Sequence, residues 1–370
     1  MNAVMYGAGN IGRGFIGQLF SQSGYEVIFV DVNAEVVERL NIDHEYPIHI
    51  ISETGNEDIM VKNVRAVNGR DMESVSAEIC QADIMATAVG VNVLPRIAGP
   101  IAQGLRRRWE AGIVKPLNII ICENLIDANQ YLKQLIAKEM SETERILLDE
   151  RVGFVEASIG RMVPAMTPDM QKGNILRVYV EPFCELPVDR DGFKGEIPTI
   201  INMDPSSPFE YFIKRKLYIH NMGHAITAYL GQIMGYKYIW EAIGDTDICR
   251  ITHAAMFESA RALSLECGME LKVIHNYVED LIIRFGNKQL GDTVERVGRD
   301  LPRKLAPNDR LLGAFSLCIR QGVIPRNISI GIHAAMYFKD STTPEKMLEI
   351  DQQGLKESQI TISECIAQYV

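Results

Sequence analysis

The stretch MNAVMYGAGNIGRGFIGQLFSQSGYEVIFVD, residues 1–31, decides the fold of the first half of the chain. Its apolar residues 3–6 are expected to form a strand that leads directly into Gly7-Ala8-Gly9-Asn10-Ile11-Gly12. Residues 11–23 carry apolar side chains at helical spacing, and residues 26–32 are expected to form a second strand. A strand, a glycine turn, a helix and a second strand in this order are typical of a doubly wound α/β sheet.

The glycine turn predicts a dinucleotide site. Gly7 permits the tight turn, Gly9 lets a pyrophosphate approach the backbone, and Gly12 allows close packing of helix and strand. The helix N-terminus offers free N–H groups and a partial positive charge. Asp31, 19 residues after Gly12, can bind both ribose hydroxyls and would repel a 2′-phosphate, which favours NAD over NADP. The predicted NAD-binding residues are Gly7, Gly9, Asn10, Ile11, Gly12 and Asp31; the alternative is a glycine turn in an unrelated α/β domain.

Strand and helix patterns continue to alternate up to about residue 182. Apolar strands are expected at residues 84–89, 117–122, 153–159 and 176–182, in a mostly parallel sheet covered on both faces by helices. A strand pair at residues 49–52 and 59–64 interrupts this sheet. Because ligands bind beyond the carboxyl ends of such strands, Thr87 in the strand that ends at Gly90 is a further candidate to border the cofactor. An ordinary strand-to-loop exit is the equal alternative.

Proline and glycine cluster between residues 184 and 209, and this cluster predicts a domain boundary. We expect a Rossmann-type NAD-binding domain over residues 1–200 and a mainly α-helical substrate and catalytic domain over residues 201–370. Helical periodicity in the second domain covers residues 209–234, 239–267, 271–285, 309–321, 328–336 and 344–354, and no strand is expected there.

Three polar residues on an otherwise apolar helix are candidate catalytic groups. At 100° per residue, Lys216, Asn221 and His224 fall within one 140° arc. Partial burial would lower the pKa of Lys216 towards the range that a general base needs near neutral pH. A solvated lysine beside a core histidine is the alternative. Asn124 follows an expected strand, where its amide could donate to an oxygen that gains negative charge or could cap the next helix.

A second candidate site is the cationic segment VERVGRDLPRKL, residues 294–305. Arginine binds phosphate in a planar bidentate geometry and lysine acts as a point charge. We therefore expect Arg296, Arg299, Arg303 and Lys304 to bind a phosphate or carboxylate, with a solvated, acid-paired surface as the alternative.

Composition excludes several other classes of protein. The 370 residues carry a net charge of −10 at pH 7, which argues against nucleic-acid binding through a basic surface. The sequence contains no run of 18 uncharged apolar residues, so no membrane span is expected. The N-terminal residues also lack the basic and apolar regions of a signal peptide. The seven cysteines show no CxxC pairing, and neither an HExxH motif nor an Asp/Glu/His cluster indicates a metal site, so we expect a cytoplasmic protein with reduced thiols and no bound metal.

The chain resembles the polyol-specific long-chain dehydrogenases over nearly its whole length, most closely the bacterial mannitol-1-phosphate 5-dehydrogenases. The resemblance is carried by GAGNIGRGFIG (residues 7–17), CENL (residues 122–125), the K-x4-N-x2-H pattern of Lys216, Asn221 and His224, and VERVGRDLPRKL with its following DRL. It departs from the wider family's Asp-Arg-x-x-Pro segment, because Gly160 stands in the position of the aspartate.

The resemblance implies zinc-independent, NAD-dependent oxidation of D-mannitol 1-phosphate to D-fructose 6-phosphate, and the reverse. Lys216 would be the general acid/base, Asn124 and Asn221 would hold the reacting oxygen, and His224 would bind a neighbouring hydroxyl. The partner is thus a small sugar phosphate, with no nucleic acid or membrane involved. Alternatives within the class are a tagaturonate or fructuronate reductase and a dehydrogenase of free polyols; outside it, a catalytically idle NAD-binding protein remains open.

Overall fold

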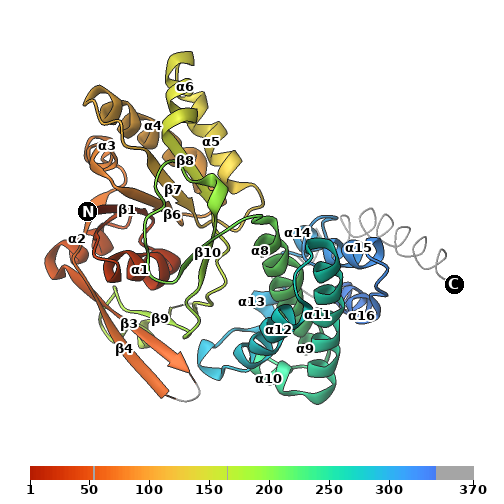
Figure 1. The fold of residues 1–370 in the computed structure, drawn as a ribbon. Coiled ribbons are helices and arrows are strands. Elements are labelled where there is room, and N and C mark those ends of the chain that lie inside the picture. The colour runs from red at the N-terminus through yellow and green to blue at the C-terminus, as the bar shows by residue number, and fades with distance from the viewer. Residues whose placement is uncertain (53–54, 165, 339–370) are drawn as a thin grey trace. The chain divides into compact units, whose positions relative to one another are not determined.

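The first part of the protein is built on a six-stranded sheet in the order β5-β2-β1-β6-β7-β8, in which every pair of neighbours is parallel (Figure 1). The coordinates are a computed structural model that describes residues 1–52, 55–164 and 166–338. The strands are β1 (Asn2–Tyr6), β2 (Glu26–Asp31), β5 (Val64–Asn68), β6 (Ile84–Thr87), β7 (Leu117–Ile121) and β8 (Val152–Glu156).

Helices cover both faces of this sheet, as the uninterrupted apolar strands predict. Alternate residues of β1 serve different layers: Ala3 and Met5 pack into one core with Phe15 and Leu40, whereas Val4 joins the other. The first layer holds α1 (Gly17–Gln22) and α2 (Ala34–Asp43). The second holds α3 (Met72–Gln81), α4 (Leu94–Glu110), α5 (Ala128–Lys138) and α6 (Glu142–Arg151). The predicted Rossmann-type architecture is confirmed.

A small sheet interrupts the main one, and here two predictions need correction. The hairpin of β3 (Glu45–Ser52) and β4 (Gly55–Lys62) is present as expected. The predicted strand 176–182, however, does not extend the main sheet, because β9 (Val178–Val180) pairs with β3 instead. Strand β5 was not predicted: it follows β4 after the single residue Asn63, whose left-handed conformation (φ 59°) turns the chain out of the hairpin.

The region rich in proline and glycine contains a two-stranded parallel pair, β10 (Leu186–Asp189) and β11 (Met203–Ser206). Strand β11 falls within residues 201–370, where no strand was expected, because the expected helical periodicity begins only at residue 209. The chain then divides into two units between Ile213 and Lys214, within the helix α8 (Glu210–Arg215).

The second unit is helical over its described residues 214–338, as predicted. A π-helical segment, Lys216–Asn221, continues α8 into α9 (Met222–Ile233). The other helices are α10 (Ile239–Gly244), α11 (Thr246–Cys267), α12 (Leu271–Phe285), α13 (Val294–Gly298), α14 (Leu301–Lys304), α15 (Leu312–Arg320) and α16 (Arg326–Ala335). The helix predicted at residues 344–354 lies outside the described residues.

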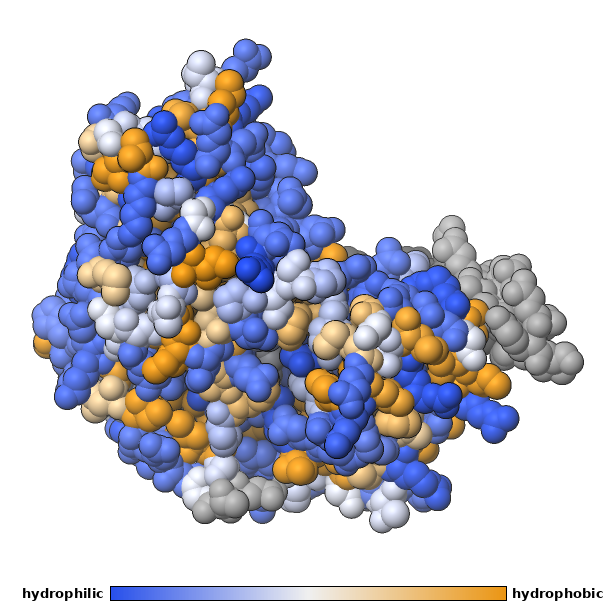
Figure 2. Space-filling view, viewed as in Figure 1, coloured by the Kyte–Doolittle hydropathy of each residue, from blue (hydrophilic) through white to orange (hydrophobic). Residues whose placement is uncertain are grey.

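Hydrophilic residues cover most of the face drawn in Figure 2, with apolar residues in separate groups. Among the described residues, no helix combines the length and apolar character that crossing a membrane requires.

Candidate functional site

The glycine turn has the geometry that a bound pyrophosphate needs. Gly7 has a φ of 104°, and a Cβ there would lie 2.5 Å from the carbonyl oxygen of Ala88. A Cβ on Gly12 would lie 1.9 Å from the carbonyl oxygen of Gly7, so only glycine fits where the helix starts. A Cβ on Gly9 would meet nothing within 4 Å, which leaves the backbone open to a ligand at this point.

Helical structure starts at Asn10, one residue before the predicted start, and passes at once into the π-helical segment Gly12–Ile16, which was not predicted. Arg13 in this segment is buried, and its guanidinium donates to the carbonyl oxygens of Ala8 (2.6 Å) and Ile175 (2.9 Å). The Asn10 amide donates to the carbonyl oxygen of Pro164 (3.3 Å). The turn is thus held from both sides.

Asp31 lies at the end of β2, beside the glycine turn. One carboxylate oxygen accepts the N–H of Ala8 (2.7 Å) and the other accepts the N–H of Asn33 (2.9 Å). A carboxylate has about four acceptor positions, so both oxygens can still accept a hydroxyl proton. The residues present therefore fit an adenosine ribose without a 2′-phosphate.

The ends of β6 and β7 are tied together by Glu123. Its carboxylate accepts the N–H groups of Val89 and Gly90, both at 2.9 Å. Burial raises the pKa of Glu123, and the two N–H donors oppose that rise. Thr87 is fully buried at the end of β6, and Asn124 is exposed after β7, where Asp127 rather than Asn124 occupies the N-cap of α5.

The segment that departs from the family pattern has a structural arginine. Arg161 is buried and donates to the carbonyl oxygen of Gly14 (3.0 Å) and to the side chain of Gln18 (2.8 Å), which fixes the helix of the glycine turn. A Cβ on Gly160 would lie 3.1 Å from the ring of Phe183, so an aspartate here would require that ring to move.

In the helical unit, Lys216 and Asn221 are the first and last residues of the π-helical segment. The sequence-based estimate assumed α-helical geometry here, and that assumption is wrong. In a π-helix the hydrogen bonds join residues five apart. The angle between Lys216 and Asn221 around the helix axis is therefore smaller than the value calculated at 100° per residue. His224 follows Asn221 by three residues in α9 and shares its side of the helix. Lys216 is half-buried.

His224 has an environment that keeps it neutral. Its ring stacks on Phe285 of α12, with centroids 4.8 Å apart and planes 13° apart, and its Nε2 lies 3.5 Å from an oxygen of Asp292. Burial lowers the pKa of His224 to about 4; Asp292 opposes this, and nearby cationic side chains add to it, namely Arg296, Lys304 and Arg310. Asp292 also pairs with Arg296. Because burial outweighs the attraction of Asp292, the His224 ring that faces this carboxylate is neutral near pH 7.

Asn221 and His224 line a cavity of about 320 Å³ within the helical unit. Five cationic side chains and one carboxylate complete most of its wall: Arg296, Arg299, Arg303, Lys304, Arg310 and Asp300. All four cations predicted from the sequence are therefore in one cavity with two of the three residues predicted on the helix. Lys216 is not among the lining residues of this cavity.

The arginines of this cavity, here called the cationic cavity, differ in how strongly they are already paired. Arg296 pairs with Asp292, and Arg303 pairs with Asp300 (2.5 Å). The buried Arg310 pairs with Asp309. In the described part of the chain, Arg299 alone among the lining arginines forms no ion pair with a carboxylate, and its side chain is exposed.

Lys304, like Arg310, is a buried cation of the cavity. Its ammonium group donates to the carbonyl oxygens of Val297 and Arg299, and so fixes the loop between α13 and α14. Burial lowers the pKa of Lys304 to about 7, and the charges of Arg310 and Arg303 add to this. A phosphate dianion in the cavity would favour the protonated form.

Sequence reasoning missed two residues of the cavity region. Arg310 stood in the quoted DRL segment but was not named as a ligand, and Asp292 precedes the cationic segment. Tertiary packing brings both to the site, since Arg310 joins the cations of α13 and α14 from the loop before α15. In the sequence, the quoted DRL segment was the signal that could have identified Arg310 as part of the site.

Two family models match the chain. The model described as the mannitol dehydrogenase Rossmann domain matches residues 1–202, and the mannitol dehydrogenase C-terminal domain matches residues 209–368. A mannitol-1-phosphate 5-dehydrogenase of Brevibacillus brevis (strain 47 / JCM 6285 / NBRC 100599) is 40% identical over 338 residues, which cover 91% of this chain and 86% of that relative.

Two solved structures share the fold at low sequence identity. A substrate-free D-sorbitol dehydrogenase has a TM-score of 0.77 at 17% identity, covering 92% of this chain and 81% of its own. The Pseudomonas fluorescens mannitol 2-dehydrogenase, in a ternary complex with NAD and D-mannitol, has a TM-score of 0.75 at 15% identity, covering 95% and 83%.

Proposed function

The chain belongs to the mannitol dehydrogenase family, and from that relation we propose that it interconverts D-mannitol 1-phosphate and D-fructose 6-phosphate with NAD. It is an oxidoreductase, and NAD is its cofactor. The relative that shares 40% identity is itself a mannitol-1-phosphate 5-dehydrogenase, which supports oxidation at C5. None of the six cysteines among the described residues is in a disulfide bond, which fits the proposed cytoplasmic location.

The residues that would hold NAD are those of the glycine turn and Asp31. The open backbone at Gly9 and the helix N-terminus would receive the pyrophosphate, and Asp31 the ribose. Glu123 would keep the loop at Val89 and Gly90 in place beside the cofactor. Bound NAD supplies the hydride acceptor for this reaction.

In oxidation, the neutral amine of Lys216 accepts the proton of the C5 hydroxyl as the C5–H bond gives up its hydride and the carbonyl forms. In reduction, the protonated Lys216 returns that proton. Asn221 and Asn124 donate to the oxygen as negative charge develops on it, which is the arrangement that lowers such barriers. The neutral His224 can both donate to and accept from a neighbouring substrate hydroxyl. These roles rest on the family pattern, and the shared π-helical segment of Lys216 and Asn221 supports them.

One observation carries the choice of a phosphorylated substrate: the cationic cavity places five basic side chains beside Asn221 and His224. A free polyol has no charge to balance them, whereas a phosphate dianion can accept charge-assisted hydrogen bonds from several at once. We propose that Arg299 is the principal phosphate ligand, since its guanidinium is not committed to a carboxylate, and that Arg296, Arg303, Lys304 and Arg310 supply the surrounding positive charge.

A substrate panel tests the proposal. The purified protein is assayed with NADH and fructose 6-phosphate, fructose, tagaturonate or fructuronate in parallel. Fructose 6-phosphate should be reduced with the highest kcat/KM. A hexuronate or free fructose in first place would overturn the choice of substrate, and NAD binding without turnover of any of them would overturn the assignment of an activity.

A further inference from the structure

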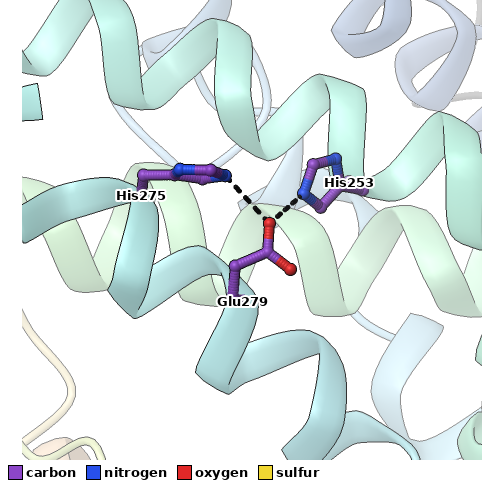
Figure 3. A group of neighbouring side chains, drawn as sticks. All are labelled: His253, His275 and Glu279. Atoms are coloured by element: carbon purple, nitrogen blue, oxygen red, sulfur yellow. Dashed lines mark hydrogen bonds and ion pairs between the residues drawn. The ribbon is translucent and has the colours of Figure 1, made fainter. Parts of the chain in front are cut away.

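We propose that His253, His275 and Glu279 form a binding site for a divalent transition-metal ion of the Zn²⁺ type, separate from the chemistry described above. His253 lies on α11, and His275 and Glu279 lie one turn apart on α12. Figure 3 shows both imidazole rings directed at one carboxylate oxygen of Glu279.

The distances are close to those of a metal-ligand set. Nε2 of His253 lies 2.7 Å from Oε1 of Glu279, and Nε2 of His275 lies 2.9 Å from the same oxygen. All three ligand atoms lie within 4.8 Å of one another. Ligands about 2.0–2.1 Å from a tetrahedral Zn²⁺ are about 3.3–3.4 Å apart. An ion could therefore bind if the carboxylate moved back by about half an ångström. Each Nε2 would then coordinate the ion in place of its hydrogen bond to Glu279.

The neighbours of these groups favour a fixed arrangement. The ring of Phe257 lies nearly parallel to His253 (5° between planes) and edge-on to His275, at a centroid distance of 4.9 Å. Phe257 thus limits the rotation of both imidazoles.

The site is open to an incoming ion. The side chains of His253, His275 and Glu279 are 35%, 42% and 51% exposed, so an ion can reach them without any helix moving, and water can complete its coordination. Two imidazoles and one carboxylate suit Zn²⁺ and neighbouring first-row divalent ions better than Mg²⁺ or Ca²⁺, which prefer oxygen ligands.

An ion held here would link α11 to α12. The same α12 carries Phe285, whose ring stacks on His224, and Tyr277, whose ring lies 4.2 Å from the guanidinium carbon of Arg215, next to Lys216. The expected consequence is a helical unit that is more resistant to heat when Zn²⁺ is present.

The test measures Zn²⁺ binding to the full chain without substrate or NAD, so its outcome is independent of the proposed activity. After chelator treatment and in a non-thiol reductant, equilibrium dialysis compares the wild type with His253→Gln, His275→Gln and Glu279→Gln. His333→Gln, at an exposed histidine of α16, is the matched control. Circular dichroism confirms that each variant is folded.

We expect each of the three variants to bind one equivalent of Zn²⁺ less than the wild type. Removal of a group that only supports a ligand weakens metal affinity about 10–100-fold, and removal of a ligand should weaken it more. Wild type and the control should keep that equivalent, and Zn²⁺ should raise the thermal midpoint of these two alone. Co²⁺ in place of Zn²⁺ should give the visible absorption of a nitrogen- and oxygen-ligated ion, again only in these two. No binding by the wild type, or equal binding by the three variants, would overturn the proposal.

Discussion

Replacing Arg299 with alanine tests the phosphate site at an exposed cation that forms no ion pair with a carboxylate among the described residues. Arg299 lines the cationic cavity and has no carboxylate partner among the described residues, so its removal leaves no buried acid unpaired. A hydrogen bond to a charged group contributes about 1.5–3 kcal/mol. At 1.36 kcal/mol per factor of ten, the KM for mannitol 1-phosphate should rise about 10- to 150-fold. The kcat should change little, because the phosphate on C1 is remote from the reacting C5 and binds ground state and transition state alike.

The assay is NADH formation at varied mannitol 1-phosphate and saturating NAD. Arg261→Ala, which removes an exposed arginine of α11, is the control and should leave both constants unchanged. The KM for NAD should also be unaffected. A KM for mannitol 1-phosphate within a factor of two of wild type would refute the assignment of Arg299, and an equal loss with free mannitol would show that phosphate recognition is not involved.

Three further predictions follow from the geometry. Because the pKa of Lys304 is about 7, its positive charge is present below that pH and lost above it. The inhibition constant of sulfate should therefore rise between about pH 6 and pH 8 in the wild type and be independent of pH in Lys304→Met. A wild-type inhibition constant that does not change with pH would contradict this. Asp31→Ser should raise the KM for NAD about 10- to 150-fold and reduce the preference over NADP, and an unchanged cofactor ratio would remove Asp31 from the ribose site. Gly12→Ala should lower the free energy of unfolding by about 1–3 kcal/mol or more and abolish NAD binding. Gly99→Ala, which places its methyl group in open space, should change neither property. Thermal unfolding and NAD titration measure the two effects.

The main sheet could be predicted because its signals are local. The glycine turn constrains the backbone residue by residue, and strands buried on both faces are apolar throughout. The strand predictions that were wrong or missing depend on distant pairing partners or on the conformation of a single residue. The apolar pattern of β9 indicates a strand but not which sheet it joins, and β5 is separated from β4 only by the left-handed Asn63.

The candidate site was predicted in part for the same reason. The four cations of residues 296–304 are close in sequence, so their shared location in one cavity could be expected. Arg310 and Phe285 reach this region only through packing of separate helices. The π-helical segment from Lys216 to Asn221 was invisible because hydrophobic periodicity was interpreted with α-helical spacing.

The central claim is that the amine of Lys216 moves the proton during hydride transfer, and Lys216→Ala tests it most directly. We predict that single-turnover formation of NADH from mannitol 1-phosphate slows by orders of magnitude, while NAD titration gives an unchanged dissociation constant because the glycine turn is intact. Lys214→Ala, two residues earlier, is the matched control and should retain turnover. Near-normal NADH formation by Lys216→Ala would contradict the account.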